Sequence, residues 1–443
     1  MTSSYSLEPA PGAIPVLGHL LKVAGDPLGA FQSFRPIADI VTIRLATRTA
    51  FIVNHPDLIR HMLVNQAANF DKGAQFDKIR PLFGNGIATS SGGFHLRQRR
   101  MMQPAFHHSQ MPAYVAIMEQ VTAARTDAWQ DTQLIAMDRE LHAIALTIVA
   151  RALFSADIGQ HLVAEIEQSL PVILDGITRR AMAPTDLLEK LPTPYNRRLG
   201  HALDRIHSGV EQIIGNYQGD PDHGDLLSAL LRARDDDGGG MSLQQVHDEI
   251  MTILLAGSET SANTMSWACH LLAQHPETQR HVQAEIDQVL NGRSITFVDL
   301  VKLEFTSRVV KETQRLYPAF WLSSRRPLIE VEIGGHAIPA GSQVFYSIHA
   351  LHHDPVLHHD PERFDPDRWL PQRFRVIPRN AFIPFGAGAR NCIGERFALT
   401  EALVVLATII ARWTLHPVPG ESPRPLPKGI LTPSQLPLTL ERR

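Results

Sequence analysis

A glycine-rich loop around one cysteine holds the residues best suited to metal chemistry. It reads Phe385-Gly386-Ala387-Gly388-Ala389-Arg390-Asn391-Cys392-Ile393-Gly394, and a helical pattern follows from Phe397. Free amide groups and the helix dipole stabilise a thiolate just ahead of a helix N-terminus, and Arg390 adds positive charge. Small residues such as Gly386 and Gly394 let the backbone pass close to a flat ligand. The loop therefore predicts a thiolate beside such a ligand, with a buried or incidental cysteine as the alternative.

A second group of polar residues lies at the centre of a long predicted helix. Ser242 and Gln245 form a capping-box pattern, and Pro276 ends the segment, which predicts about 30 residues of helix. Its centre reads Ala256-Gly257-Ser258-Glu259-Thr260-Ser261. Glycine, acid and hydroxyl residues together are poor for helix propensity, and such a departure is where function is expected. The alternative is a hydroxyl that bonds back to the carbonyl four residues earlier.

The loop resembles the cytochrome P-450 signature Phe-x-x-Gly-x-Arg-x-Cys-x-Gly, and every defined position matches. The resemblance implies haem b with Cys392 as the axial ligand of the iron, a thiolate that favours O–O cleavage. It assigns Phe385, Gly386, Arg390 and Gly394 to the haem-binding loop. It also gives Thr260 the role of positioning oxygen and Glu259 that of feeding protons, with the haem between the long central helix and the cysteine loop.

Two further patterns resemble segments of the same family. Glu312 and Arg315 match its Glu-x-x-Arg pair, and we expect them to form a buried structural network with Arg363 of Pro361-Glu362-Arg363-Phe364. His95 and Arg99, four residues apart, match a helix that binds a haem propionate. Arg326 matches a second propionate-binding position, for which the neighbouring Arg325 could compete.

The elements that must position these residues are mostly helices. Val41 to Leu45 and Ala50 to Val53 predict one hairpin. Leu328 to Ile333, followed by two glycines and then Gln343 to Tyr346, predict another. Helical patterns and proline-rich turns alternate elsewhere. The fold class is therefore mainly α, a large helical region with a small β region, as the cytochrome P-450 fold implies.

The sequence contains few segments that could link separate domains. Asp235 to Gly240 is a polar, glycine-rich stretch that we interpret as an exposed loop inside one domain spanning residues 1–443, although it could also separate domains. That length leaves no room for a fused reductase. The resemblance therefore implies electrons from a ferredoxin and its NAD(P)H-dependent reductase. A basic segment with Arg373, Arg375 and Arg379 would suit an acidic partner, or is a solvated loop.

Composition narrows the setting of the protein. The chain is 44% apolar and 20% charged, which is typical of a globular core. A net charge of −3 gives no reason to expect nucleic-acid binding. The N-terminal apolar stretch is interrupted by Pro15 and Gly18 and is too short for a membrane anchor. With only Cys269, assigned to core packing, and Cys392, we expect a cytoplasmic, reducing location. We also expect a monomer.

The expected function is the insertion of one oxygen atom from O2 into a hydrophobic substrate, most simply a hydroxylation. The stretches Asp225 to Leu231 and Leu254 to Thr260 resemble segments of actinobacterial terpene oxygenases, including pentalenene oxygenases. This resemblance points to a cyclic sesquiterpene or another terpenoid in secondary metabolism. Fatty-acid or steroid hydroxylation, peroxide use and haem-based gas binding are the alternatives, and Lys72 could anchor a fatty acid. Positions expected to line the substrate pocket are mostly apolar: Phe76, Ile173, Ile177, Ile253, Leu254, Ala256, Phe320, Trp321, Leu322 and Leu431.

One cluster suggests a different metal. Four histidines and two aspartates lie between His352 and Asp360, a composition that could form a zinc site. Pro355 breaks the helical spacing that would bring these side chains together. We therefore expect a polar turn there.

Overall fold

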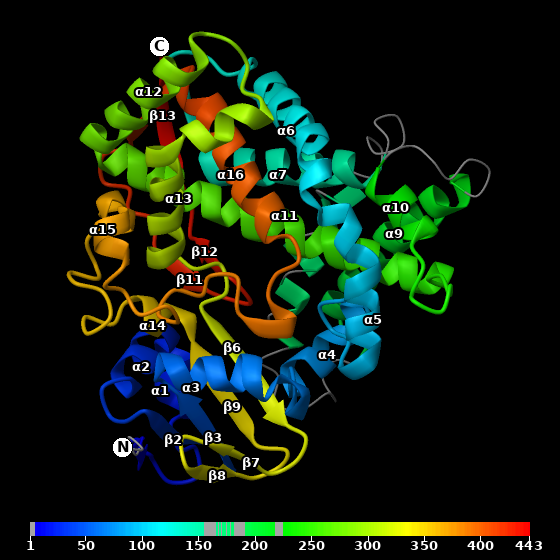
Figure 1. Cartoon of the computed structure of the whole chain (residues 1–443), viewed down its shortest axis with the longest axis vertical. Helices are drawn as coiled ribbons and strands as arrows, with labels where there is room; N and C mark the ends of the chain where they lie inside the picture. Colours follow the sequence, from blue (N-terminus) through cyan, green and yellow to red (C-terminus); the bar gives the residue numbers. More distant parts are fainter. Residues whose placement is uncertain are drawn as a thin grey trace. The chain divides into compact units, whose positions relative to one another are not determined.

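The computed structural model describes residues 5–154, 191–217 and 225–443, together with 165–166, 168–169, 171–173, 175–177 and 179–180. The chain divides into two compact units. Figure 1 labels helices and strands of both. The first contains Met1–Ala74, Lys311–Cys392 and Pro425–Thr432, and the second contains Gln75–Val310, Ile393–Arg424 and Pro433–Arg443. Each unit combines segments far apart in the sequence, and one division falls inside a helix, so neither unit is a continuous stretch of chain. The single-domain interpretation stays a prediction.

The first unit is organised around a six-stranded sheet of order β1-β2-β3-β9-β6-β4. Its helices are α1 (Leu20–Gly25), α2 (Pro27–Phe34), α3 (Pro56–Arg60), α14 (Ile348–His352) and α15 (Pro371–Phe374). Its strands are β1 (Leu7–Pro9), β2 (Ile40–Leu45), β3 (Arg48–Val53), β4 (Phe70–Asp71), β6 (Leu322–Pro327), β7 (Val331–Ile333), β8 (His336–Ile338), β9 (Gln343–Ser347), β11 (Pro425–Pro427) and β12 (Leu431–Pro433).

Side chains along the strands of this sheet point alternately to its two faces, and each face is covered by a buried apolar cluster. β2 and β3 form the first predicted hairpin, antiparallel, with Ile40 opposite Val53. Ile40 and Val53 belong to one buried cluster, whereas the next residues along the two strands, Val41 and Ile52, belong to another. Successive side chains of a strand point to opposite faces, so both faces of the sheet are covered.

The second predicted hairpin is wrong in its partner strand. Gly334 and Gly335, with φ of +60° and +86°, turn the chain between β7 and β8, which pair with each other. β9, the expected partner, pairs instead with β3 and β6. A two-glycine turn pairs the residues that directly flank it, so it joins β7 to the three residues that follow.

The second unit is mainly helical. Its helices are α4 (Ala74–Phe83), α5 (Gly92–Met102), α6 (Met111–Thr126), α7 (Met137–Leu153), α9 (Pro194–Asn216), α10 (Leu226–Arg232), α11 (Leu243–Gln274), α12 (Pro276–Leu290), α13 (Glu304–Leu316, which continues into the first unit) and α16 (Glu395–Ile410). Its strands are β5 (Leu134–Ala136), β10 (Trp413–Pro417) and β13 (Pro437–Arg442), which form a sheet of order β10-β13-β5.

The long helix α11 is the predicted one, 32 residues from Leu243 to Gln274. The capping box is present: the Gln245 amide donates to the Ser242 hydroxyl at 3.2 Å, and the Ser242 amide donates to the Gln245 side-chain oxygen at 2.7 Å. α11 packs along α7, and a Cβ at Gly257 would lie 3.2 Å from a Val149 methyl group. Gly257 thus allows the two helices to approach closely, and this pair supports the polar residues at the centre of α11.

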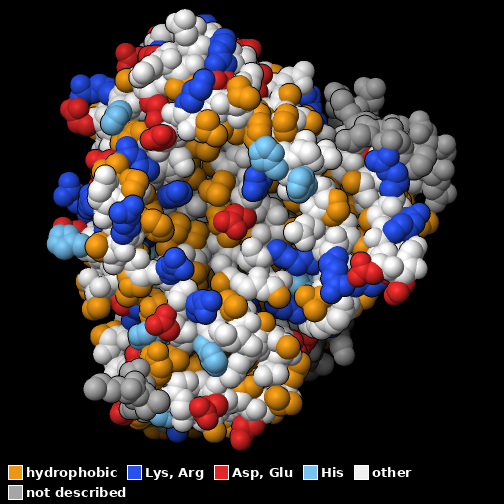
Figure 2. All heavy atoms as spheres, viewed as in Figure 1, with side chains coloured by type: hydrophobic (Ala, Val, Ile, Leu, Met, Phe, Trp, Pro, Cys, Tyr) orange, Lys and Arg blue, Asp and Glu red, His pale blue; other side chains and the backbone are white. Residues whose placement is uncertain are grey.

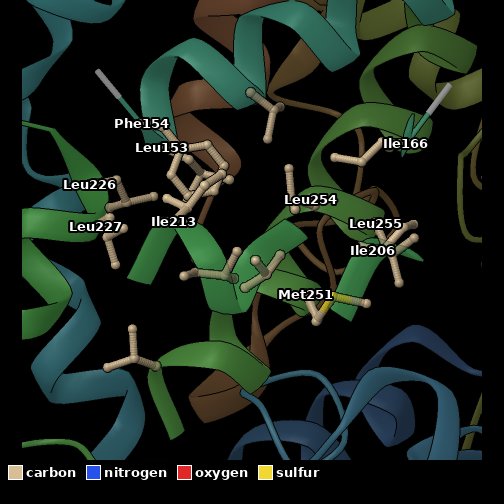
Figure 3. Close-up of a cluster of buried hydrophobic side chains, with 14 of the residues drawn as sticks. Leu153, Phe154, Ile166, Ile206, Ile213, Leu226, Leu227, Met251, Leu254 and Leu255 are labelled. Atoms are coloured by element: carbon tan, nitrogen blue, oxygen red, sulfur yellow. The ribbon is translucent and has the colours of Figure 1, made fainter. Parts of the chain in front are cut away.

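An apolar cluster fills the second unit around α11 (Figure 3). Leu254 and Leu255 from α11 pack with Leu226 and Leu227 from α10 and with Ile206 from α9. These five side chains are at most 4% exposed. The cluster therefore holds the N-terminal half of α11 against α9 and α10. Among the described residues, no helix is long and apolar enough to span a membrane.

Candidate active site

The cysteine loop has a defined backbone in the first unit. The Cys392 amide donates to the Phe385 carbonyl at 2.9 Å, which closes the loop, and the Cys392 side chain is exposed. Gly388 has φ of +72°, and a Cβ there would lie 2.1 Å from the Leu63 carbonyl oxygen, so this position requires glycine. At Gly386, with φ of +74°, an added Cβ would meet nothing within 4 Å. Gly394 is the N-cap residue of α16, so Cys392 precedes a helix N-terminus as the sequence predicts.

Cations gather near this loop in the first unit. Loss of hydration and the charges of Arg325 and Arg390 lower the pKa of Lys72 to about 7, while Cys392 opposes that shift. Loss of hydration and the charge of Arg325 likewise lower the pKa of Arg390 to about 10, against the attraction of Asp71. A haem needs a thiolate ligand for its iron and positively charged hydrogen-bond donors for its propionates. A thiol with several cations close to it can provide both. The residues present therefore fit the group.

Arg325 and Arg326 differ in their partners. Arg326 donates two hydrogen bonds to the Asp71 carboxylate, from Nε at 3.0 Å and from Nη2 at 2.5 Å, on the pair formed by β4 and β6. Arg325 is 7% exposed, and its Nη1 donates to the Ser324 carbonyl at 2.7 Å. Because consecutive residues of a strand point to opposite sides, only one of them can face the cation cluster. Arg325 is the one whose charge lowers the pKa of both Lys72 and Arg390, so Arg325 faces the cluster.

Glu312 is the centre of a fully buried network in the first unit. Arg315 donates to it from Nε at 3.0 Å and from Nη2 at 2.8 Å. Arg368 Nε donates at 3.2 Å and the Trp369 indole at 2.9 Å. Glu312 and Arg315 are both 0% exposed. A carboxylate buried this deeply is stable only with such donors, so the network holds α13 to the segment that contains Arg368.

The predicted role of Arg363 in this network is wrong. Its side chain is exposed, and only its main-chain carbonyl takes part, accepting from Arg315 Nη2 at 3.2 Å. The second guanidinium comes from Arg368, in Pro366-Asp367-Arg368-Trp369. Both segments have a proline, an acid, an arginine and an aromatic residue in the same order. The sequence alone did not show which of the two segments has its arginine side chain buried.

Thr260 lies on α11 in the second unit, in an unbroken helix. Its hydroxyl donates to the Ala256 carbonyl at 2.7 Å, and Ser258 makes the equivalent bond to Leu254 at 2.6 Å. The back-bonding alternative is therefore present at both residues. A hydroxyl that donates in this way keeps its oxygen lone pairs, so Thr260 remains able to accept a hydrogen bond.

Glu259, beside Thr260, is 5% exposed and has a partner that the sequence did not suggest. Its Oε2 lies 3.2 Å from Nε2 of His142 on α7. These residues are 117 positions apart, and His142 lies in an ordinary helical pattern. Only the packing of α7 against α11 brings them together.

The predicted propionate ligands of α5 share one face of that helix in the second unit. His95 is 3% exposed, and Arg99 follows one turn later. The neighbouring arginines have other partners: Arg97 Nε donates to Asp235 at 2.5 Å, and Arg100 Nη1 donates to Asp236 at 3.1 Å. The acidic loop that could have separated domains is thus bound to α5 inside one unit.

The predicted pocket residues fall into several environments. In the second unit, Ile173, Ile177, Ile253 and Leu254 belong to the apolar cluster around α11, Phe76 lies on α4, and Ala256 lies on α11. In the first unit, Trp321, Leu322 and Leu431 belong to a core cluster beside the sheet, and Phe320 is 44% exposed. The Trp321 indole also donates to the Lys428 carbonyl at 2.9 Å. Trp321 and Leu431 are therefore core residues of that unit.

The histidine-rich segment is structural in its contacts. His352 Nε2 accepts from the Ile383 amide at 3.1 Å, and His358 Nε2 lies 3.2 Å from the Ala381 carbonyl. His349 and His353 stack with ring centroids 4.1 Å apart. Among the described residues, no three histidine, cysteine, aspartate or glutamate side chains form a potential metal site.

Comparison with known proteins identifies the family. The family model described as "Cytochrome P450" matches residues 9–440. The chain is 44% identical to cyclooctat-9-en-7-ol 5-monooxygenase of Streptomyces melanosporofaciens, over 98% of the chain and 95% of that protein. It is 38% identical to pentalenene oxygenase of Streptomyces avermitilis, over 98% and 97%. The crystal structure of the cytochrome P450DA haem domain matches with a TM-score of 0.90 and 26% identity, over 99% of this chain and 98% of that one. The chain therefore belongs to the cytochrome P450 family and is a monooxygenase that uses haem b, O2 and electrons derived from NAD(P)H.

Proposed function

We propose that this monooxygenase hydroxylates a cyclic terpenoid in secondary metabolism. The observation that carries the proposal is the similarity, over nearly the whole chain, to two Streptomyces oxygenases named for cyclooctat-9-en-7-ol and for pentalenene. The apolar side chains around Leu254 in the second unit support it (Figure 3). Such side chains contribute burial energy of about 25 cal/mol per Å² but few hydrogen bonds for a polar ligand.

Each unit contains residues that we propose as haem ligands, by resemblance to the family. Cys392 would supply the thiolate ligand, and Phe385, Gly386 and Gly394 would keep the loop open beside it. Within the first unit, Arg390 and Arg325 would bind propionate oxygens. His95 and Arg99, on α5 of the second unit, remain predicted propionate ligands by resemblance alone. We assign Arg325 in place of Arg326, because Asp71 already holds Arg326 through two hydrogen bonds. Lys72 joins this set, which makes it less suited to anchor a fatty-acid carboxylate.

Bound through a cysteine thiolate, haem supplies the oxygen-activating chemistry of the family. Thr260 orients a hydrogen bond at the reacting oxygen, through a hydroxyl whose own proton is directed at the Ala256 carbonyl. Glu259, nearly buried on the same helix, delivers protons. The apolar side chains around Leu254 exclude bulk water, so protons arrive by an ordered route.

Electrons would come from a ferredoxin and its reductase, delivered to a monomer in the cytoplasm. The docking candidate is the basic segment of the first unit, where Arg375 and Arg379 are exposed. Exposed apolar side chains accompany them, Phe374 at 47% and Val376 at 81%. On the face seen in Figure 2, basic side chains are interspersed with acidic and apolar ones. Recognition would therefore depend on a local patch such as this one.

A binding titration tests the substrate class. Pentalenene and cyclooctat-9-en-7-ol should each shift the ferric haem from low to high spin in a saturable way. Long-chain fatty acids and steroids should give a weaker shift. A saturable shift with a fatty acid and none with either terpenoid would contradict the proposal.

A further inference from the structure

The contact between His142 and Glu259 joins an exposed residue to a buried one inside the second unit. The His142 side chain is 32% exposed, whereas that of Glu259 is 6% exposed. Their Nε2 and Oε2 atoms lie 3.2 Å apart. A titratable ring therefore leads from the partly exposed side of α7 to an acid at the centre of α11.

The other nitrogen of the ring decides where its protons lie. His142 Nδ1 is 2.6 Å from the Asp138 main-chain carbonyl, one turn earlier on α7. A carbonyl only accepts, so Nδ1 carries a proton. Glu259 also accepts when it is ionised, so Nε2 carries the second proton and the ring is an imidazolium. Loss of hydration opposes this charge, but the hydrogen bond and the charge of Glu259 outweigh it and raise the pKa of His142 to about 8.

The remaining acids nearby have other partners. The Asp138 carboxylate adds attraction to His142 from the same helix, and it accepts from the Leu436 amide at 3.1 Å. Glu401 on α16 lies against Ser261 of α11, and burial raises its pKa to about 8. Glu259 is thus the carboxylate that accepts the Nε2 proton of His142.

We propose that His142 is the positioning residue that loads Glu259 with protons from solvent. This rests on the proposed function, in which Glu259 delivers protons to the reaction. In the loading step the Nε2–H bond breaks and an O–H bond forms on Glu259 Oε2, which leaves a neutral acid and a neutral imidazole protonated at Nδ1. Water or buffer then returns a proton to Nε2 at the exposed side. The step moves one proton and no electrons.

The first test observes the ring directly. Histidine ring signals are recorded by NMR across pH in the diamagnetic, reduced, carbon monoxide-bound holoenzyme, and His142 is assigned from the signal lost in His142→Gln. The His142 ring should titrate near pH 8. In Glu259→Gln its pKa should fall to about 6.5 or below, since the carboxylate charge is gone. A His142 pKa that does not change in Glu259→Gln would overturn the proposal.

The second test measures product formed per reduced nicotinamide across pH. The wild-type ratio should fall as the pH rises through about 8. His142→Gln should lower the ratio several-fold and flatten the profile. His142→Arg should do the same, because arginine keeps the charge but does not release its proton. A matched control is His416→Gln, which breaks an exposed histidine–glutamate pair of 2.7 Å between β10 and β13 and should match the wild type.

These variants separate two failures. If Glu259→Gln keeps the wild-type ratio, then Glu259 does not deliver protons and the proposed function is wrong at this residue. If Glu259→Gln lowers the ratio but His142→Gln does not, only the role of His142 is overturned. Recovery of the ratio in His142→Arg would also overturn it, because charge alone would then suffice.

Discussion

Two buried carboxylates, one in each unit, are held by different kinds of base. Glu312 accepts hydrogen bonds from Arg315, Arg368, Trp369 and the Asp365 amide, and it is 0% exposed. Glu259 has a histidine partner and lies beside Thr260. Arginine remains protonated at every working pH, whereas histidine exchanges its proton near neutrality.

The difference matches the different roles that we propose for two acids of similar burial. Glu312 is surrounded by several donors that keep their protons, so its network contributes rigidity to the first unit. Glu259 instead contacts a base that exchanges its proton near neutrality, which suits the proton delivery that we propose. In this account, the nature of the partner, more than the depth of burial, separates the structural carboxylate from the one that we propose to deliver protons.

The largest expected effect is the loss of the network around Glu312. Glu312→Gln leaves the guanidinium groups of Arg315 and Arg368 buried without a counter-charge, and Arg368→Ala removes one donor. Breaking such a buried pair costs about 3–5 kcal/mol. The free energy of unfolding, from denaturant titration of the holoenzyme, should fall by this amount.

A matched control is Arg363→Ala, which keeps the carbonyl that Arg315 uses. It should change the free energy of unfolding by only about 0.5 kcal/mol or less, as expected for an exposed position. If Arg363→Ala destabilised the protein as much as Arg368→Ala, the corrected network would be wrong.

The histidines of the two units should respond to pH in opposite directions. Burial lowers the pKa of His358, 1% exposed, to about 4, and lowers those of His349 and His352 well below their ordinary value. Because protons bind these histidines more tightly in the unfolded chain, protonation favours unfolding. Their contribution to the free energy of unfolding is fully present above about pH 6.5 and is lost as the pH falls. His358 alone should account for a loss of roughly 3 kcal/mol at pH 4.

His142 has the opposite sign, because its pKa is raised to about 8. Its contribution to stability is fully present below about pH 6.5 and is lost as the pH rises through about 8. The free energy of unfolding should be measured across pH in the wild type and in His358→Gln. If the free energy of unfolding fell equally steeply at acid pH in both proteins, the burial of a neutral His358 would be contradicted.

Thr260→Ala should act on coupling more than on stability. Loss of the hydroxyl removes an ordered hydrogen bond, so reduced-nicotinamide consumption should continue while product falls several-fold and hydrogen peroxide rises. Ser258→Ala is the matched control, because Ser258 makes the same bond to the carbonyl four residues earlier. Equal coupling in the two variants would mean that Thr260 serves helix packing only.

The smallest effect should come from surface charge in the first unit. Arg373 is held by Asp365 at 2.7 Å, whereas Arg375 and Arg379 are exposed. Changing both exposed arginines to glutamate should slow electron delivery modestly, with substrate binding unchanged. The difference should shrink as salt rises, since exposed charges are screened over about 10 Å at 0.1 M. Equal electron-transfer rates at low salt would exclude this docking face.

Local patterns predicted part of this molecule. The capping box and proline gave the bounds of α11, strand alternation gave the β2–β3 hairpin, and a spacing of three residues gave the Glu312–Arg315 pair. Contacts between distant segments did not follow from the sequence. The motif around Arg363 has the same pattern as the one around Arg368, so the pattern could not identify the buried arginine. β9 pairs with β3 and β6 and not with the strand before it in the sequence. His142 contacts Glu259 only because α7 packs against α11. Such contacts depend on which side chain turns inward, and neighbouring residues do not determine that.

The most direct test of the account is the absorption spectrum of the reduced, carbon monoxide-bound protein with and without Cys392. The wild type and Cys269→Ser should both show the red-shifted Soret band of thiolate ligation, because Cys269 is fully buried in α11. Cys392→His should lose that band while it still binds haem. A red-shifted band that persists in Cys392→His would contradict the assignment of Cys392 as the haem ligand.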